Sequence, residues 1–366
     1  FLKRDYGKAL RHFIRQNLAL VEIVDFGDKQ NFENAMTYTG IFMFRASNDS
    51  DNNIEYKQGL EESPVIFSPN KLDQEVWNFS MSNNDDLLEK IQHEKKYLID
   101  LCDGIYQGIA TGKDNVFLVD GNIILGHDIE RGILRPFLKG KNIRPYTIEW
   151  GGLYLIYPYD ENGNVISEQF FKSHYPNAYQ YMLDNKDNLK GRSYFDKSSK
   201  AWYELWNQRK PTRFEGEKIV TLDNASCNSF ALDINGFFGT TTVYSLKIIS
   251  DDGLNNKYVL GVLNSKLLNY YHRNTSVPQA GGFFRYQALF IKNLPIASAN
   301  ETIVNRISKC VTEILLGKKQ NADTTSLENQ IDFLVYHLYG LTYDEVLKVD
   351  PETPISREEY EAYNIE

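Results

Sequence analysis

The stretch Leu20-Val-Glu-Ile-Val-Asp-Phe-Gly27 sets the fold of residues 1–48. Its β-branched residues predict a strand, which the Phe-Gly pair ends. Downstream, a polar loop leads to a second predicted strand at residues 37–44. Upstream, four apolar residues at helical spacing predict a short amphipathic helix over residues 6–16: Tyr6, Leu10, Phe13 and Ile14. Helix, strand, loop and strand in this order are typical of the end of an α/β sheet.

The rest of the 366-residue chain changes character along its length. Residues 45–62 are polar and acidic and predict a linker, and an apolar face predicts a helix over residues 84–101. The middle of the chain is dense in Tyr and Phe, and short β-like runs alternate there with Gly and Asn turns. We predict strands at residues 116–119, 153–157, 218–222, 229–232, 241–248 and 283–290, and helices at residues 168–184 and 257–271.

The C-terminal part is predicted to be helical. Residues 327–338 form one apolar stripe, and Gly340 follows at the position that a helix-ending glycine takes. Thr342-Tyr-Asp-Glu345 has the spacing of a capping box, which predicts the start of a further helix. The sequence therefore predicts a mixed α/β chain in four parts: residues 1–48, 49–104, 105–297 and 298–366.

Composition excludes several classes of protein. Hydrophobic residues make up 42% of the chain and charged residues 24%, which indicates a globular protein. Cys102, Cys227 and Cys310 lie far apart and form no CxxC, which excludes a disulfide framework or a structural zinc site. Unpaired thiols predict a cytoplasmic location. No apolar run approaches the ~18 residues of a membrane span, so we expect no membrane partner. The chain starts without Met, and we expect it to be part of a longer protein.

The net charge of −9 conceals a locally basic middle. Residues 105–295 carry 22 Lys and Arg against 18 Asp and Glu, and residues 261–295 contain four cations and no acidic residue. A phosphate-binding surface needs local basicity rather than a basic protein. By charge alone, a solvated surface of mixed sign remains the alternative interpretation.

Motifs for catalysis are absent from the sequence. No G-x-G, P-loop, HExxH or GxSxG motif is present. Each histidine is interpreted as structural or as a surface residue: His12, His93, His127, His174, His272 and His337. We therefore expect no catalytic residue and no metal site in this sequence.

Three glycine turns suit binding rather than catalysis. The first, Leu134-Arg-Pro-Phe-Leu-Lys-Gly-Lys-Asn-Ile-Arg-Pro-Tyr146, places cations around one glycine, where backbone amides and side chains could hold phosphates. The second, Gly108-Ile-Ala-Thr-Gly-Lys-Asp-Asn115, presents Thr111 and Lys113. The third, Gln279-Ala-Gly-Gly-Phe-Phe-Arg-Tyr286, combines a flexible Gly-Gly pair with aromatic residues and Arg285. Ordinary surface loops are the alternative interpretation of each turn.

Segments in a fixed order carry a resemblance to a known family. The N-terminal ones are Phe1-Leu-Lys-Arg-Asp-Tyr-Gly-Lys-Ala-Leu-Arg-His-Phe-Ile-Arg15, Ile23-Val-Asp-Phe-Gly27, Asn31-Phe-Glu-Asn-Ala35 and Tyr38-Thr-Gly-Ile41. The downstream ones are residues 108–117, Leu138-Lys-Gly-Lys-Asn-Ile143, Tyr203-Glu-Leu205, Lys218-Ile-Val220, Val262-Leu-Asn-Ser-Lys266, Ile291-Lys-Asn-Leu-Pro-Ile296 and Ile331-Asp-Phe-Leu-Val-Tyr-His-Leu-Tyr-Gly-Leu-Thr-Tyr-Asp-Glu345. Residues 1–48 resemble the end of the catalytic domain of a DNA adenine-N6 methyltransferase of a type II, type IIG-like restriction-modification system. The downstream segments resemble the TaqI-like C-terminal specificity domain and its helical tail.

This resemblance implies a fold and a reaction. The fold would be the end of a Rossmann-like methyltransferase sheet, then a β-rich α/β target-recognition domain and a helical C-terminal tail. Such enzymes flip an adenine out of duplex DNA and methylate its N6 from S-adenosylmethionine. The resemblance implies that Phe32 stacks on the flipped base. A phenylalanine that covers the edge of the sheet is the alternative.

The sequence departs from the family in what it lacks. The glycine motif for the cofactor and the Asn/Asp-Pro-Pro-Tyr/Phe motif are absent, and Tyr157-Pro-Tyr159 does not replace the latter. We therefore expect this chain by itself to bind no cofactor, with S-adenosylmethionine serving the parent protein. We expect two partners: double-stranded DNA, and an N-terminal methyltransferase part outside this sequence that could include a nuclease.

The predicted interface with DNA comprises two kinds of residue. Those predicted to anchor phosphates are Lys139, Lys141, Arg144 and Arg273. Those predicted to read bases or grooves are Thr111, Lys113, Gln279 and Arg285. Three alternatives to this interpretation stay open: a type IIG enzyme with a fused endonuclease, a protein-interaction module without DNA specificity, and an unrelated α/β protein.

Overall fold

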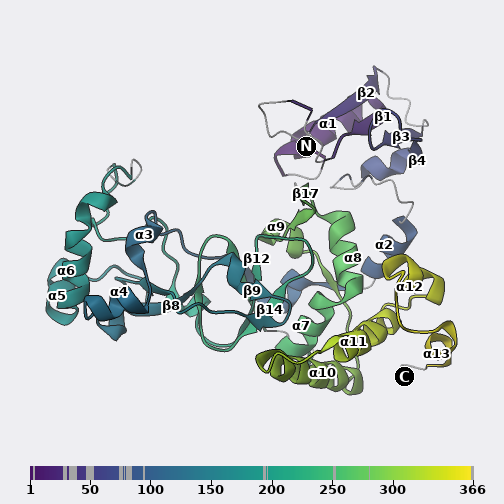
Figure 1. The fold of residues 1–366 in the computed structure, drawn as a ribbon. Helices are drawn as coiled ribbons and strands as arrows, with labels where there is room; N and C mark the ends of the chain where they lie inside the picture. The colour runs from purple at the N-terminus through teal and green to yellow at the C-terminus, as the bar shows by residue number, and fades with distance from the viewer. Residues whose placement is uncertain are drawn as a thin grey trace. The chain divides into compact units, whose positions relative to one another are not determined.

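The chain folds into two compact units. A computed structural model describes residues 1–2, 5–27, 31–32, 39–46, 53–73, 77, 79, 85–93, 95–192, 195, 197–249, 253–279 and 281–363. The first unit comprises residues 1–93 and 271–285, and the second comprises residues 94–270 and 286–366. The four predicted parts differ from this division, since residues 271–285 group with the first unit and the helical tail groups with the β-rich part (Figure 1).

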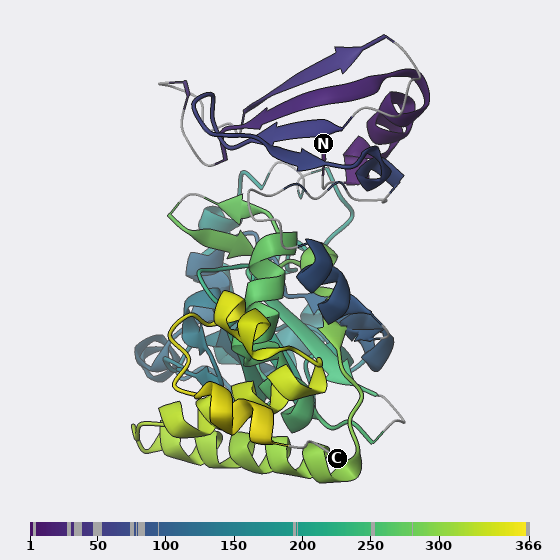
Figure 2. The same ribbon diagram turned by 90° about the vertical axis from the view of Figure 1, so that its right-hand side faces the viewer.

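The first unit contains the predicted order of helix, strand, loop and strand. Helix α1 (Lys8–Asn17) precedes β1 (Ala19–Asp25), which pairs antiparallel with β2 (Gly40–Arg45). The predicted start of the second strand, residues 37–38, lies outside the described residues. Figure 2 shows these strands with α1 beside them. The α/β character of this part is confirmed.

The predicted linker proves to contain a strand of the same sheet. Strand β3 (Ile54–Lys57) pairs parallel with β1, with Tyr56 opposite Ile23, and β4 (Val65–Phe67) pairs antiparallel with β3. The sheet order is β2-β1-β3-β4. The linker prediction failed here because a four-residue strand in a polar context shows too short an alternation to detect, while long-range pairing and burial stabilise it.

Helix α1 buries a different face from the one predicted. Ile14 is 2% exposed and lies in the core, but Tyr6, Leu10 and Phe13 are 80%, 45% and 53% exposed. The periodicity of apolar residues was therefore sufficient to predict the helix. It was wrong about which residues the helix buries.

The first unit also holds a short helix and a hairpin. Helix α2 spans Asp85–Gln92 and is shorter than the predicted helix over residues 84–101. The chain instead forms β5 (Lys96–Tyr97), which belongs to the second unit and pairs there with β19 (Pro295–Ile296), and then the 3-10 turn Leu98–Leu101. The hairpin consists of β17 (Pro278–Gln279) and β18 (Phe283–Arg285).

Two four-stranded sheets form the centre of the second unit. The first sheet is antiparallel, in the order β14-β12-β16-β6, and contains β6 (Cys102–Gln107), β12 (Lys218–Leu222), β14 (Phe230–Asp233) and β16 (Val243–Ile248). The other has the order β15-β8-β11-β7 and contains β7 (Leu118–Val119), β8 (Leu134–Leu138), β11 (Tyr154–Ile156) and β15 (Phe238–Gly239). Shorter strands are β9 (Ile143–Arg144), β10 (Thr147–Ile148) and β13 (Asn224–Ala225).

The strand predictions for residues 116–290 are confirmed in four places and fail in part in two. The prediction for residues 218–222 matches β12, and those for residues 153–157, 229–232 and 241–248 overlap β11, β14 and β16. Residues 116–119 instead begin as the end of α3 (Asp114–Phe117), and residues 283–290 end in α9 (Ala288–Ile291). Buried apolar side chains suit a short helix as well as a strand, so the pattern alone could not decide.

Both predicted helices of this unit are broken in two. Residues 168–184 form α5 (Glu168–His174) and α6 (Pro176–Asp184), because Pro176 has no N–H to continue a helix and starts a new one. Residues 257–271 form α7 (Asn256–Asn264) and α8 (Lys266–Thr275), separated by Ser265 with extended backbone. A further short helix, α4, spans Gly121–Gly126.

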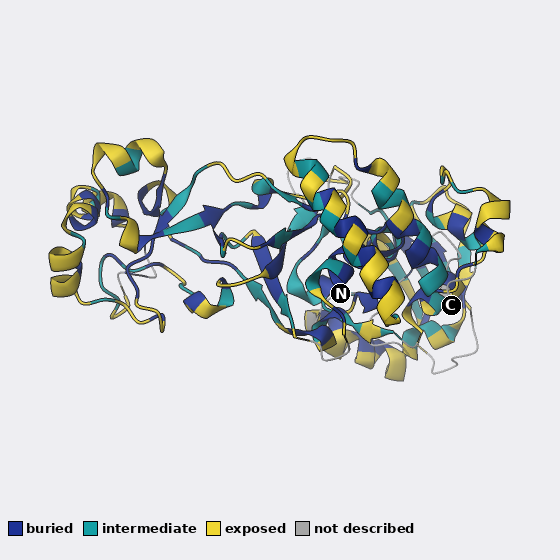
Figure 3. Cartoon of the chain, turned by 90° about the horizontal axis from the view of Figure 1, so that it is seen from below, coloured by how far each residue is buried: buried dark blue, intermediate teal, exposed yellow. Residues whose placement is uncertain are grey.

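The tail is helical as predicted. It contains α10 (Glu301–Lys319), α11 (Thr325–Leu338), α12 (Tyr343–Val349) and α13 (Arg357–Ala362). Gly340 has a φ of +65°, and the capping box of Thr342 with Glu345 is present. Buried and exposed residues alternate along the helices in Figure 3. Among the described residues, no helix is both long enough and apolar enough to cross a membrane.

The tail packs against α7 at a glycine. A Cβ added to Gly261 would lie 2.7 Å from the side chain of Ile307 on α10, a distance that real Cβ atoms do not reach. Lys257 on α7 also donates to Thr312 on α10 at 2.9 Å. This close approach explains why the tail belongs to the second unit.

Candidate nucleic-acid interface

Four loops of the second unit converge on one another. Residues 108–113 contact residues 239–242 through Ile109 N, which donates to Gly239 O at 2.7 Å. They also contact residues 206–209, since the backbones of Ala110 and Asn207 exchange two hydrogen bonds of 3.2 and 2.9 Å. The turn at residues 139–142 joins them through Gly140 N, which donates to Thr242 Oγ1 at 3.3 Å.

Gly108 permits this convergence. A Cβ at Gly108 would lie 2.2 Å from the carbonyl oxygen of Thr240 and 2.3 Å from that of Gly239. Any other residue would therefore push the loops apart. Two of the predicted glycine turns, which lie about thirty residues apart in the sequence, are brought together here.

The converging loops hold Lys139 close to a carboxylate of the neighbouring loop. Lys139 Nζ lies 3.7 Å from Asp114 Oδ2, and Asp114 begins α3. The Lys139 side chain is 39% exposed and that of Asp114 is 54% exposed. An exposed pair at this distance contributes about 0–1 kcal/mol and can exchange partners at little cost.

Thr111, which was predicted to read bases, is buried in the structure. Thr111 is 2% exposed, and its hydroxyl donates to Asp114 Oδ1 while it accepts the backbone N–H of Lys113 at 3.2 Å. Its side chain is therefore occupied inside the loop. Its hydrogen bonds fix Lys113 and Asp114 in the loop, and the Thr-Gly-Lys segment gave no sign of this burial.

Lys141 and Arg144 lie on one tight turn. Lys141 is exposed within the 3-10 turn Gly140–Asn142, and Arg144 is exposed on β9. Arg144 Nη1 donates to Lys141 O at 3.0 Å, and its Nη2 lies 3.8 Å from Glu149. Because a guanidinium has five N–H donors, Arg144 keeps capacity for a further acceptor such as a phosphate oxygen.

The other predicted residues belong to the first unit. Arg273 is exposed at the C-terminal end of α8, and its guanidinium lies 5.0 Å from the ring centre of Phe284. Gln279 and Arg285 lie on the β17–β18 hairpin and are half-buried, and the buried Arg285 Nε has no hydrogen-bond partner among the described residues. Phe32 is 58% exposed. Its stacking on a base stays a prediction.

Two exposed aromatic residues were missed by the selection from sequence. Trp206 is 39% exposed and lies beside the second glycine turn, where its backbone N–H donates to Thr111 O at 3.2 Å. Phe283 is 44% exposed on the hairpin. Aromatic density in this sequence hides them, since most of its Tyr and Phe residues are buried.

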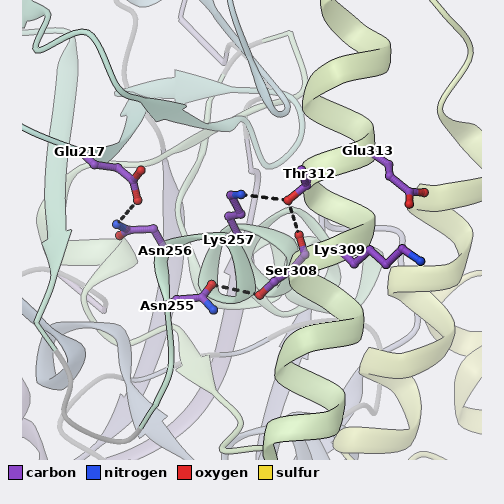
Figure 4. Close-up of a pocket in the computed structure, with 8 residues that line it drawn as sticks. All are labelled: Glu217, Asn255, Asn256, Lys257, Ser308, Lys309, Thr312 and Glu313. Atoms are coloured by element: carbon purple, nitrogen blue, oxygen red, sulfur yellow. Dashed lines mark hydrogen bonds between the residues drawn. The ribbon is translucent and has the colours of Figure 1, made fainter.

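A pocket elsewhere in the second unit lies apart from these residues. It has a volume of about 530 Å³, and α7 and α10 supply most of its lining. Its polar groups bind one another: Asn256 donates to Glu217 at 2.7 Å and Ser308 donates to Asn255 at 3.0 Å (Figure 4). None of the predicted DNA-contacting residues lines it, and within the described part of the chain no group of His, Cys, Asp and Glu could hold a metal ion.

A mixed α/β fold with basic loops at one site is a property of many nucleic-acid-binding proteins. Comparison with known proteins narrows the class of nucleic-acid-binding protein. Residues 135–296 match the TaqI-like C-terminal specificity domain. The matched residues include most of β8, most of the first glycine turn, and the hairpin.

The chain is also similar to complete enzymes. It is 28% identical to the type II methyltransferase M.MjaIV of Methanocaldococcus jannaschii, over 62% of this chain and 76% of that protein. It is 21% identical to the type II methyltransferase M.BstVI of Geobacillus stearothermophilus, over 94% of this chain and 63% of that protein. The chain thus spans less than two thirds of M.BstVI.

A solved structure shares the fold. The type IIL restriction-modification enzyme MmeI, determined in complex with DNA, aligns with 95% of this chain and 46% of its own, with a TM-score of 0.57 and 11% sequence identity. The predicted fold class is therefore confirmed. The relatives are named as methyltransferases, without the base or the atom that they modify.

Proposed function

We propose that this chain recognises a specific sequence in duplex DNA for an adenine-N6 DNA methyltransferase of a restriction-modification system. A longer protein would carry out methyl transfer from S-adenosylmethionine, with the catalytic motifs outside this chain. We place this activity in the cytoplasm, which is consistent with three free cysteines.

The convergence of the basic loops is the observation that best supports this proposal. Lys113 comes from one glycine turn and Lys139 and Lys141 from another, and hydrogen bonds hold the two turns on one backbone frame. Cations on a fixed frame bind phosphates at little cost in entropy, and the contacts set the register of the protein on the duplex. Two of the three lie within the specificity-domain match.

The contacts divide into two sets of residues. Lys139, Lys141, Arg144 and Arg273 would bind phosphates. Lys113, Gln279 and Arg285 would read bases, because amide and cationic groups form hydrogen bonds with base edges. Thr111 is left out of this proposal because it is buried.

Phe32 would stack on the flipped adenine. Its exposure leaves the ring open to a ligand, and a π-face substitutes for part of the stacking that the base loses. The longer protein is the place to test this role. There, Phe32→Ala should lower the rate of methylation and reduce the fluorescence rise of a 2-aminopurine at the target position.

Selection from a random duplex library tests recognition directly. The chain is incubated with the library at low salt, and bound duplexes are sequenced. One enriched motif that contains adenine is the expected result. Binding that ignores salt would contradict phosphate contact, since neutralised phosphates release counterions. Absence of binding at any salt would favour a protein-interaction module.

A further inference from the structure

The β17–β18 hairpin has a firmly held root. Ser276 Oγ donates to Arg285 O at 2.8 Å, and His272 Nε2 lies 2.9 Å from the same oxygen. Burial lowers the pKa of His272 to about 4, so its ring is neutral at pH 7. Because a carbonyl oxygen only accepts, Nε2 carries the proton and donates it. Two buried donors therefore clamp the base of the hairpin to α8.

The tip of the hairpin has the opposite character. Gly281 and Gly282 have φ angles of +79° and +78°, a conformation that side chains disfavour, and a Cβ on Gly282 would meet open space. Gln279 and Phe283 lie directly opposite each other beside this turn. A bare backbone flanked by an amide and an aromatic ring thus projects from a fixed root.

The two neighbouring phenylalanines of β18 have different environments. The ring of Phe284 is half-buried, with the Arg273 guanidinium 5.0 Å from its centre. Phe283 is 44% exposed. The Phe283 ring at the hairpin tip is therefore open to a ligand, whereas the Phe284 ring is partly covered by Arg273.

We propose that Phe283 is a wedge that enters the base stack of a DNA duplex when the hairpin lies in a groove. This inference rests on the proposed function and adds a positioning residue to it. Apolar wedges from minor-groove proteins unstack a base step and kink the duplex, and this lowers the cost of extruding a neighbouring base.

The charge of the surrounding sequence favours a nucleic acid over an apolar protein surface. Residues 261–295 contain no Asp or Glu. Lys266 pairs with Asp350 at 2.7 Å, but Arg285 lies on the hairpin and Arg273 adjoins it. Arg273 adjoins the hairpin through Phe284 and would hold a phosphate beside the groove. The glycine tip lets backbone approach the bases closely, which bulkier turns prevent.

Binding of a DNA duplex by residues 1–366 tests whether Phe283 acts as a wedge. The selected duplex carries 2-aminopurine, a fluorescent adenine analogue that brightens when unstacked, at each adenine position in turn. We expect the wild-type chain to raise the emission at one position. Phe283→Ala should abolish that rise and weaken binding about tenfold, the effect of losing one aromatic stack.

Three further variants separate a wedge from other roles. Phe170→Ala removes a ring of similar exposure, 41%, from α5. It should change neither the 2-aminopurine emission nor the affinity for the duplex. Phe283→Trp should keep the emission rise, because any flat ring can stack. Arg273→Ala should lower the salt slope by about one, whereas Phe283→Ala should leave that slope unchanged because it removes no charge.

The outcomes distinguish the wedge from the proposed function. If wild type binds the selected duplex and Phe283→Ala binds and brightens it equally, the wedge is wrong and recognition stands. If wild type selects no duplex, both proposals fall. A Phe283→Ala variant that loses binding together with its salt slope would indicate a misplaced hairpin and would also overturn the wedge.

Discussion

The second unit contains one lysine–aspartate pair in a sheet and another among its loops. Lys218 on β12 and Asp233 on β14 are both 0% exposed, and Lys218 also donates to Phe214 O. Lys139 and Asp114 are 39% and 54% exposed and lie 3.7 Å apart. The chemistry of the two pairs is the same, but the solvent around them differs.

This difference in burial gives the two ion pairs different roles. Asp233 also accepts the backbone N–H of Phe237 at 2.9 Å, so the buried carboxylate is saturated and the pair can only join two strands and a turn. In the exposed pair, a phosphate could replace Asp114 on Lys139 without leaving a buried charge. Burial fixes an ion pair in place, and exposure makes it available to a partner.

The largest effect is expected from breaking the buried pair. Lys218→Met leaves Asp233 charged and unpaired in the core, which should lower the free energy of unfolding by about 3–5 kcal/mol. Denaturant unfolding measures this. The double variant Lys218→Met/Asp233→Asn should be more stable than the single one, because no charge remains. A loss below about 1 kcal/mol for Lys218→Met would show that the pair is not isolated from water.

A second buried carboxylate, in the tail, tests how burial affects stability where the structure describes no ion pair as close as that of Lys218 with Asp233. Asp332 on α11 is 6% exposed and accepts the backbone N–H of Lys266 at 2.8 Å, and burial raises its pKa to about 7. The unfolded aspartate has a pKa of about 3.9, so the native state binds the proton more tightly. Stability should therefore fall by about 2–4 kcal/mol as pH rises from about 4 to 7.

Asp332→Asn isolates this titration. The variant has no proton to lose, so its unfolding free energy should fall less steeply with pH, by up to about 1.4 kcal/mol per pH unit in that window. Urea unfolding from pH 4.5 to 7.5 supplies both curves. Parallel curves would mean that Asp332 is ionised throughout.

Lys141 is exposed, so Lys141→Ala should change DNA binding and leave the free energy of unfolding within about 0.5 kcal/mol of the wild-type value. If Lys141 holds a phosphate, affinity should drop about three- to tenfold for every duplex, and the salt slope should shrink by about one. Lys309→Ala, on α10, is the matched control. An unchanged slope in Lys141→Ala would remove this residue from the interface.

The smallest effect is expected at Asp114. Asp114→Asn removes a negative charge beside Lys139 and should tighten binding of all duplexes about two- to threefold. Titrations at several salt concentrations measure this. Weaker binding restricted to one base position would instead identify Asp114 as a reader of that base.

The sequence by itself predicted the helical tail, the longer strands and the resemblance to a specificity domain. Period and turn chemistry act locally, so β12, the capping box at Thr342 and the glycine after α11 could all be predicted. The break at Pro176 is also local, because proline has no N–H to continue a helix. The apolar pattern across residues 168–184 nevertheless predicted a single helix. The order of weak segments, rather than any single motif, indicated a specificity domain.

Only the tertiary structure decided which residues are available to a partner. Thr111 and Lys113 lie two positions apart in one turn, yet the hydroxyl of Thr111 is buried against Asp114 and Lys113 is only half-buried. The convergence of two glycine turns and the exposure of Phe283 depend on contacts between residues distant in sequence. Burial is a property of those contacts, and no local pattern encodes it.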